Sequence, residues 1–199
     1  MQGGLCGDLR LIETLLWDGG PVRLSLHQAR LARGCAALGV AVPDLVAVLA
    51  GCSGRLRVRV TVDLAGRVEV TRAPFVPETR GWRAVLAEGL DSTDPWRGLK
   101  TTERAIYDRT RAALPPGVDE AVLLNERGEV ADGTITNVFV AEGAGWLTPS
   151  LTSGCLPGVL RADLLARGLA REAVLRPADL RGGFHLGNSL RGLIAARLV

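Results

Sequence analysis

Glycine and proline limit the length of the regular elements that this chain can form. The 199 residues include 25 glycines and 10 prolines, and both residue types interrupt helices and strands. Many turns between short elements are therefore expected, which excludes a bundle of long helices. Hydrophobic residues make up 47% of the chain, with one methionine and few aromatics, so leucine, valine and alanine must supply most of the core. A chain of this length can form one large domain or two small lobes, and either can bury a core.

Charge and cysteine spacing exclude several functional classes. The formal net charge is only +3, and the arginines are dispersed among acidic residues, which argues against a nucleic-acid partner. The four cysteines, Cys6, Cys35, Cys52 and Cys155, lie far apart without a CxxC pair, so neither a metal site nor a disulfide framework is expected. The sequence has no apolar run of about 18 residues and no leader-like N-terminus. We therefore expect a cytoplasmic protein without a membrane partner.

Lys100 is the only lysine among the 24 Lys and Arg residues. A guanidinium keeps its proton at any working pH, whereas a partly desolvated primary amine can lose one and attack a carbonyl to form a Schiff base. Lys100 is therefore a candidate for covalent chemistry. The alternative is that a codon bias has removed the other lysines and that Lys100 is an exposed survivor. The lone lysine by itself favours neither interpretation.

Hydrophobic periodicity predicts short strands and short helices along the whole chain. The expected strands are residues 9–17, 55–62, 67–72, 82–87, 119–125, 130–140 and 146–149. Helices are expected from Ser25 to Gly39, over 44–50, after Lys100, and from 154 through about 171. In the second strand, arginines alternate with apolar residues, which indicates a half-buried strand with one charged, exposed face.

The segment 89–98 is rich in Gly, Asp, Ser and Pro, as is typical of a linker. It divides the chain into a small N-terminal lobe, residues 1–88, and a larger C-terminal lobe, residues 99–199. Lys100 would then lie at the junction, at the start of the larger lobe.

Three further features carry polar groups that could bind a ligand. His27, Arg30 and Arg33 share one flank of the first helix, for which a solvated flank is the simpler interpretation. Asp132 lies among apolar and small residues and needs a partner if it is buried. The Pro157–Gly158 entrance to a helix leaves free N–H groups at a positive dipole end, which suits a phosphate, although many such entrances bind nothing.

Several of these segments together resemble the class IV aminotransferase family, the pyridoxal-phosphate enzymes of fold type IV. The matching motifs occur in the family's order, cover nearly the whole chain, and comprise residues 12–14, 27–31, 99–104, 119–140, 147–149, 154–161 and 187–193. The last of them, Gly-Asn-Ser-Leu-Arg-Gly-Leu, looks most like the aminodeoxychorismate lyase branch rather than the branched-chain or D-amino-acid transaminases.

The resemblance implies an α+β fold of two lobes, similar to D-amino-acid aminotransferase, with pyridoxal 5'-phosphate in the cleft between them. It also implies a homodimer with active sites near the interface. The implied reaction, part of folate biosynthesis, converts the small-molecule amine 4-amino-4-deoxychorismate to 4-aminobenzoate and pyruvate. A transaminase of a branched-chain or D-amino acid is the alternative. A third interpretation, from another class, is a catalytically silent relative that binds the cofactor or a protein partner.

By the same resemblance, Lys100 would form the Schiff base with the cofactor and then act as the base that moves the proton. Asp132 would pair with the protonated pyridine nitrogen. Family members usually carry Glu at this position, and Asp is one methylene shorter. Arg104 and Arg191 are the candidates for binding substrate carboxylates.

The resemblance assigns the cofactor phosphate to a cup of residues that are far apart in the sequence. Arg30 would bind the phosphate with its guanidinium. The backbone amides of Val159 and Leu160, with Ser189 and Asn188, would complete the cup. Family members commonly have a hydroxyl residue where Leu160 stands, so one hydrogen bond to the phosphate is expected to be lost.

Overall fold

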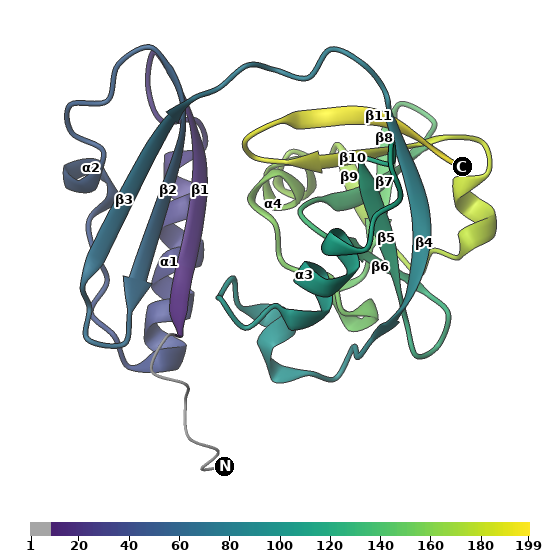
Figure 1. The fold of residues 1–199 in the computed structure, drawn as a ribbon, viewed down its shortest axis with the longest axis horizontal. Coiled ribbons are helices and arrows are strands. Elements are labelled where there is room, and N and C mark those ends of the chain that lie inside the picture. Colours follow the sequence, from purple (N-terminus) through teal and green to yellow (C-terminus); the bar gives the residue numbers. More distant parts are fainter. Residues whose placement is uncertain (1–8) are drawn as a thin grey trace. The chain divides into compact units, whose positions relative to one another are not determined.

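The computed structural model describes residues 9–199, so Cys6 lies outside the described residues (Figure 1). The chain forms two compact units. The first extends up to Val76 and also includes Leu99–Glu103, and the second comprises Pro77–Gly98 and Arg104–Val199. Each unit has its own sheet and its own core, and each is described by itself.

The first unit is a three-stranded antiparallel sheet, in the order β1-β2-β3, that packs against a helix. Its elements are β1 (Arg10–Asp18), α1 (Leu24–Leu38), α2 (Leu45–Val48), β2 (Arg55–Asp63) and β3 (Val68–Pro74). Val58 and Val60 of β2 are fully buried, whereas the alternating arginines of this strand are exposed. The predicted half-buried strand with one charged face is thereby confirmed.

The second unit is built on an eight-stranded mixed sheet in the order β6-β5-β4-β11-β10-β7-β8-β9. Its strands are β4 (Trp82–Leu90), β5 (Glu120–Asn125), β6 (Val130–Gly133), β7 (Asn137–Glu142), β8 (Gly145–Pro149), β9 (Ala170–Ala173), β10 (Phe184–Asn188) and β11 (Gly192–Leu198). Its helices are α3 (Ala105–Ala112) and α4 (Val159–Ala166), with 3-10 turns at Pro95–Gly98, Leu151–Ser153 and Pro177–Leu180. The mixed α+β architecture predicted from the sequence is confirmed.

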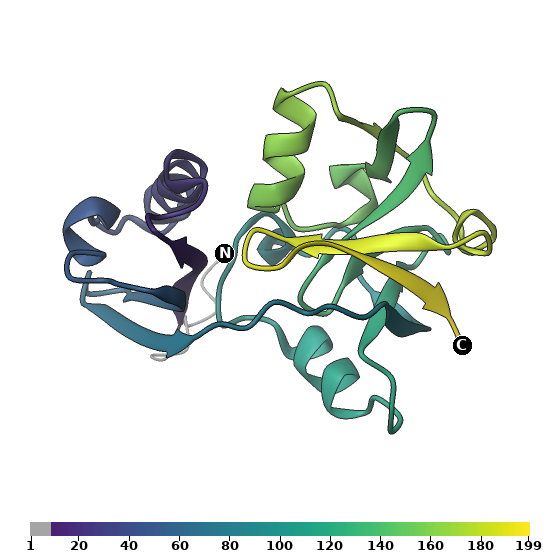
Figure 2. The same cartoon turned by 90° about the horizontal axis from the view of Figure 1, so that it is seen from above.

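Three apolar clusters of the second unit hold its sheet and helices together. One of them packs α3 on the sheet, through Ile106 and Tyr107 against Leu90 and Leu123. The largest cluster takes buried residues from β4, β5, β7, β10 and β11, including Phe184 and Leu186. A smaller one packs Leu160 and Leu164 of α4 on Phe139 of β7. In Figure 2, α4 and α3 lie on either side of the β10–β11 hairpin. The N-terminus of α4 is thereby fixed close to the turn that joins β10 to β11.

Helix α4 is shorter than expected. It ends at Ala166 because Gly168 adopts a left-handed conformation, with φ 67°, and the Leu169 amide bonds back to the Leu164 carbonyl. Ala170–Ala173, expected at the end of the helix, instead forms β9 and pairs in parallel with β8. Of the helices within residues 9–199, none has the length and apolar character needed to cross a membrane.

The two units divide differently from the expected lobes. Strand β4 begins before residue 88, yet it pairs in parallel with β5 and β11 and so belongs to the second unit. The expected linker contains the end of β4 and a 3-10 turn. Lys100 lies in the first unit, because residues 99–103 return to the edge of β1.

Candidate active site

Helix α1 and strand β1 approach each other closely in the first unit. A Cβ atom at Gly34 would lie 2.5 Å from Cδ2 of Leu11, so a larger residue here would require the Leu11 side chain to shift. Arg30 lies about one turn before Gly34 and His27 about two turns before it, on the same buried face of the helix. Both side chains therefore face the sheet, with exposed fractions of 0% and 8%. The interpretation as a solvated flank is wrong for these two residues.

Glu13 of β1 is the acceptor for both side chains. Arg30 donates from Nε to Oε1 at 2.8 Å and from Nη2 to Oε2 at 2.6 Å. Nδ1 of His27 lies 2.6 Å from the same Oε2. Glu13 is only 1% exposed, so this buried carboxylate is paired, as a buried charge must be.

The protonation states follow from these contacts. Burial alone would raise the pKa of Glu13, but the charge of Arg30 and the hydrogen bonds from Arg30 and His27 outweigh it and lower the pKa to about 2. Burial lowers the pKa of His27, against the opposing effect of Glu13. His27 is therefore neutral at pH 7, and since ionised Glu13 only accepts, Nδ1 carries the proton. Arg30 is left as the cation whose guanidinium orientation Glu13 fixes.

Lys100 lies at the free edge of β1. The Ile12 amide donates to the Lys100 carbonyl at 2.8 Å, and the Thr102 amide donates to the Arg10 carbonyl at 2.9 Å. The charge of Lys100 acts on His27, adding to the effect of burial on its pKa. The first unit thus brings Lys100 close to the Glu13–His27–Arg30 network.

In the second unit, Asp132 of β6 is held by two donors. Asn137 donates from Nδ2 to Oδ1 at 2.9 Å, and the Leu156 amide donates to Oδ2 at 3.1 Å. Asp132 is 4% exposed, so the prediction that it needs a partner if buried is confirmed. Asn137 also donates to the Leu156 carbonyl at 3.0 Å. A Cβ at Gly158 would overlap Oδ1 of Asn137, so glycine at 158 leaves the space that Asn137 occupies.

The N-terminus of α4 directly follows this contact. Gly158 is the N-cap and gives no side-chain hydrogen bond to the helix. The amides of Val159 and Leu160 are in the first turn, where no intrahelical carbonyl is available to them. The Leu160 side chain points into the apolar cluster and packs against Gly187, where a Cβ would lie 2.8 Å from Cδ2 of Leu160. Leu160 can therefore offer only its backbone N–H to an anion.

Three of the predicted site residues lie at the end of β10 and in the turn that joins it to β11. Oδ1 of Asn188 accepts from the amides of Leu190, at 3.1 Å, and Arg191, at 2.9 Å. Nδ2 of Asn188 donates to the Ile135 carbonyl at 3.0 Å. The Asn188 side chain thus organises the turn that presents buried Ser189. The Arg191 guanidinium lies 5.8 Å from the centre of the Trp82 ring.

Arg104 lies at the start of α3. Its Nε donates to Oδ1 of Asp108 at 2.7 Å, and Nη2 donates to the Thr134 carbonyl at 2.9 Å. The side chain is 22% exposed, and a guanidinium has five N–H groups. Arg104 therefore has donors in addition to those used in these two bonds.

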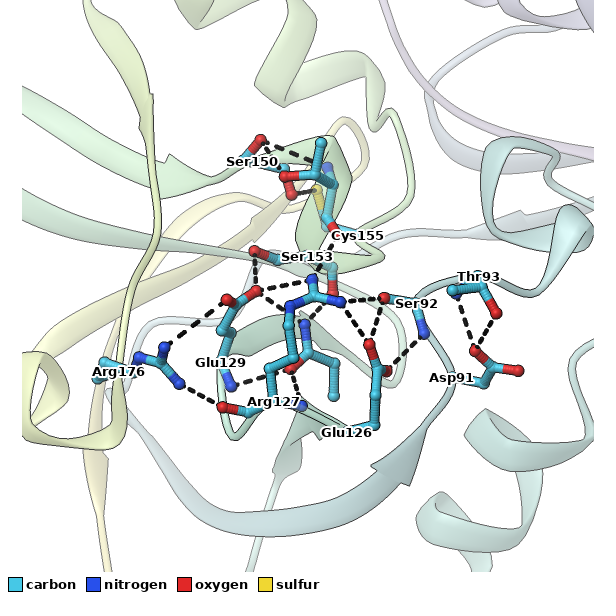
Figure 3. Close-up of polar contacts among 12 residues, drawn as sticks. Asp91, Ser92, Thr93, Glu126, Arg127, Glu129, Ser150, Ser153, Cys155 and Arg176 are labelled. Carbon is cyan, nitrogen blue, oxygen red and sulfur yellow. Dashed lines mark hydrogen bonds and ion pairs between the residues drawn. The ribbon is translucent and has the colours of Figure 1, made fainter.

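A polar network fixes the loop that ends at Leu156 (Figure 3). Oε2 of Glu129 accepts from Ser153 Oγ, Asn125 Nδ2 and Arg127 Nη2, each at 2.9 Å. Arg127 also donates to the Thr152 carbonyl at 2.7 Å. The hydrogen bonds from Arg127 and Asn125 lower the pKa of Glu129 to about 2, in spite of desolvation. This network holds the loop against the β5–β6 turn and so helps to direct the Leu156 amide at Asp132.

The structure gathers the predicted residues into two groups. Lys100 and Arg30 belong to the first unit, and the other predicted residues belong to the second: Arg104, Asp132, Val159, Leu160, Asn188, Ser189 and Arg191. Sequence reasoning gave no role to Glu13 or Asn137. The signal for Glu13 was an acid inside the apolar run of residues 11–16, the same signal that marked Asp132. Within residues 9–199, no group of three or more potential metal ligands occurs.

Comparison with known proteins gives one consistent family. Residues 10–199 match the family described as amino-transferase class IV. The chain is 30% identical to a Schizosaccharomyces pombe protein named "Putative aminodeoxychorismate lyase", over 95% of this chain and 89% of that protein. It is 28% identical to the aminodeoxychorismate lyase of Saccharomyces cerevisiae, over 55% of this chain and 34% of the yeast protein.

A solved structure shows the same fold. The crystal structure of a Mesorhizobium loti protein named "Putative amino-acid aminotransferase" superposes with a TM-score of 0.89 and 38% sequence identity. The match covers 96% of this chain and 100% of that one.

Replacing Glu13 tests the buried network of the first unit. Glu13→Gln leaves the Arg30 charge buried without a counter-charge, so we expect a loss of about 3 kcal/mol of unfolding free energy at pH 7. Because the folded-state pKa of Glu13 lies below its ordinary value of 4.5, the difference in unfolding free energy between wild type and the variant is complete above about pH 4.5. It is lost as the pH falls through about 2. Urea unfolding of both proteins at pH 7, 4 and 3 measures this, with the exposed Glu88→Gln as control. An advantage that does not depend on pH would contradict the assignment.

Replacing Gly158 tests the packing around Asp132. The added methyl group of Gly158→Ala would displace Asn137 from Asp132, and we expect a loss of about 1 to 3 kcal/mol. Gly182→Ala is the matched control, because a Cβ at Gly182 meets no atom within 4 Å. Denaturant unfolding of the two variants gives the comparison. Equal stability of both variants would show that Asn137 has room that the structure does not assign to it.

Proposed function

The chain belongs to the class IV aminotransferase family, whose members are pyridoxal-phosphate-dependent enzymes, and from this premise we propose that it is a lyase. The proposed reaction converts 4-amino-4-deoxychorismate to 4-aminobenzoate and pyruvate, a step of folate biosynthesis. The observation that carries this proposal is the similarity to the S. pombe protein, which extends over nearly the whole of both chains.

The residues present fit pyridoxal phosphate chemically. Lys100 supplies the primary amine that an aldehyde requires, and it is the only lysine in the chain. Asp132 supplies a buried carboxylate for a protonated ring nitrogen. The first-turn amides of α4 and the guanidinium of Arg30 supply donors for a phosphate dianion. The aldehyde, the ring nitrogen and the phosphate of the cofactor each have a suitable partner among these residues.

When bound, the cofactor supplies an electron sink for a substrate carbon that loses a proton. In our proposal, the Lys100 amine takes the proton from the ring carbon that bears the substrate amine. The ring becomes aromatic as the bond to the enolpyruvyl oxygen breaks and the electron pair leaves with that oxygen. The released enolpyruvate takes up a proton at its methylene carbon and becomes pyruvate. Atoms and electrons balance within the substrate, so no oxidant or amino acceptor is needed.

Asp132 has the task of keeping the ring nitrogen protonated. Its two oxygens are already oriented by Asn137 and the Leu156 amide. These fixed donors hold the shorter Asp side chain in one position. We propose that they make Asp effective where family members usually have Glu.

For the phosphate we propose Arg30, the amides of Val159 and Leu160, and Ser189. Glu13 orients the Arg30 guanidinium through Nε and Nη2, which leaves further N–H groups for an anion. Asn188 contributes by holding the turn that carries Ser189. We propose Arg104 and Arg191 for the substrate carboxylates.

A transaminase of a branched-chain or D-amino acid is the second candidate. The similarity to the M. loti protein, which is named for aminotransferase activity, favours it. The same residues would serve both reactions, because they differ in the fate of the proton and in the need for a keto-acid acceptor. A catalytically silent relative is a weaker candidate, since Leu160 can still offer its backbone amide. We further propose a homodimer in the cytoplasm.

Product formation separates the candidates. With pyridoxal phosphate and 4-amino-4-deoxychorismate but no keto acid, we expect pyruvate and 4-aminobenzoate to appear in equal amounts. Pyruvate is followed by coupling to lactate dehydrogenase. Lys100→Arg keeps the positive charge but cannot supply a neutral amine, and we expect no product from it. Activity that requires both an amino acid and a keto acid would reject the lyase in favour of the transaminase.

A further inference from the structure

Glu120, the first residue of β5, is a carboxylate with no role in the proposed reaction. Its side chain is 0% exposed, so the charge must be satisfied by the protein. The donors come mainly from one short segment, the loop Thr134 to Thr136 that joins β6 to β7. This loop separates Asp132 from Asn137 in the sequence.

The loop directs its N–H groups inward at Glu120. Oε1 accepts from the Thr134 amide at 3.0 Å and from the Thr134 hydroxyl. Oε2 accepts from the Ile135 amide at 3.2 Å and from Thr136 Oγ1 at 3.0 Å. Arg111 Nη1 lies 3.4 Å from Oε1 and 3.0 Å from Thr134 Oγ1. One carboxylate therefore binds every residue of the loop.

Two carbonyls of the same loop are used by predicted site residues. The Thr134 carbonyl accepts from Arg104 Nη2 at 2.9 Å, and the Ile135 carbonyl accepts from Asn188 Nδ2 at 3.0 Å. Since a peptide plane is rigid, fixing the Ile135 amide also fixes the Thr134 carbonyl, which lies in the same plane. The Ile135 carbonyl belongs to the next plane, and Glu120 restrains the residue that follows it through the Thr136 hydroxyl.

The loop has little freedom to move in another way. The Gly133 amide donates to the Thr136 carbonyl at 2.7 Å. A Cβ at Gly133 would overlap Thr136 Oγ1 and lie 3.2 Å from Glu120 Oε2. The turn is therefore closed on itself and packed directly against the carboxylate.

We infer that Glu120 is a positioning residue: through the Thr134 and Ile135 carbonyls it places Arg104 for a substrate carboxylate and Asn188 for the turn that carries Ser189. The Arg104 part rests on the proposed function. The Asn188 part requires only that the chain binds pyridoxal phosphate.

Two double-mutant cycles test this inference. In the first, the affinity for pyridoxal phosphate is measured by absorbance titration for wild type, Glu120→Gln, Asn188→Ala and the double variant. Each single change removes hydrogen bonds from the series that links Glu120, the loop 134–136 and Asn188. We therefore expect each to weaken the binding of pyridoxal phosphate about tenfold. The double variant should be no weaker than either single one. Additive losses, or an affinity of Glu120→Gln equal to wild type, would overturn the inference.

The second cycle uses the lyase assay with Glu120→Gln and Arg104→Lys. We expect a KM raised about tenfold and kcat changed less than about twofold in each, without further effect in the double variant. A merely structural role of Glu120 would not produce this selective and non-additive change in KM. If wild type binds the cofactor but makes no pyruvate, the proposed function fails, and the first cycle still decides the role of Glu120.

Two further variants keep the test interpretable. Asp119→Asn alters the neighbouring carboxylate, which pairs with exposed Arg80, and it should leave cofactor affinity and KM unchanged. If Glu120→Gln does not fold, Thr136→Val takes its place in both cycles, because it removes only one donor to Oε2. If Thr136→Val has the same affinity for pyridoxal phosphate and the same KM as wild type, the inference is contradicted.

Discussion

A carboxylate that is removed from water must be surrounded by hydrogen-bond donors, and four such carboxylates shape this structure. Glu13, Glu120, Glu129 and Asp132 are each less than 8% exposed, and each accepts hydrogen bonds from segments distant in the sequence. Glu13 joins a strand to a helix, Glu120 fixes a loop, and Glu129 holds the loop that leads to Leu156. Leaving such a group without partners costs several kcal/mol. The conformations around the candidate site are therefore those that satisfy these four charges.

The residues that orient the site differ from the residues that are proposed to react or bind. The residues proposed to contact the cofactor or the substrate are held by others that do not. Glu13 orients Arg30, and Asn137 with the Leu156 amide orients Asp132. Side chains fixed in this way lose little further conformational freedom when a ligand binds, which favours preorganised recognition. Leu160 is compatible with a phosphate site at the start of α4 because only its backbone is needed there. Its side chain fills the apolar cluster beside Gly187, while its amide keeps the position that a phosphate would need.

Much of the fold could be predicted from the sequence, because strand alternation and glycine stops are local signals. Strand β2 and the end of α1 at Gly39 follow from residues within a few positions. The end of α4 was missed, since the apolar pattern continues past Gly168 and only pairing with β8 makes residues 170–173 a strand. The burial of His27 and Arg30 depends on Glu13, 14 and 17 residues away, and no local pattern carries that information. Asp132 was identified as needing partners, but only the tertiary structure brings Asn137 and the Leu156 amide to it.

We propose that Lys100 is the residue that binds pyridoxal phosphate covalently. The direct measurement is incubation with the cofactor, reduction with borohydride, digestion with trypsin and mass spectrometry of the peptides. Since Lys100 is the only lysine, we expect a phosphopyridoxyl group on the peptide of residues 98–104 in wild type, with no cleavage at Lys100. The same residues of Lys100→Arg should carry no label. A label confined to the N-terminal amine of wild type, or no label on wild type at saturating cofactor, would contradict this proposal.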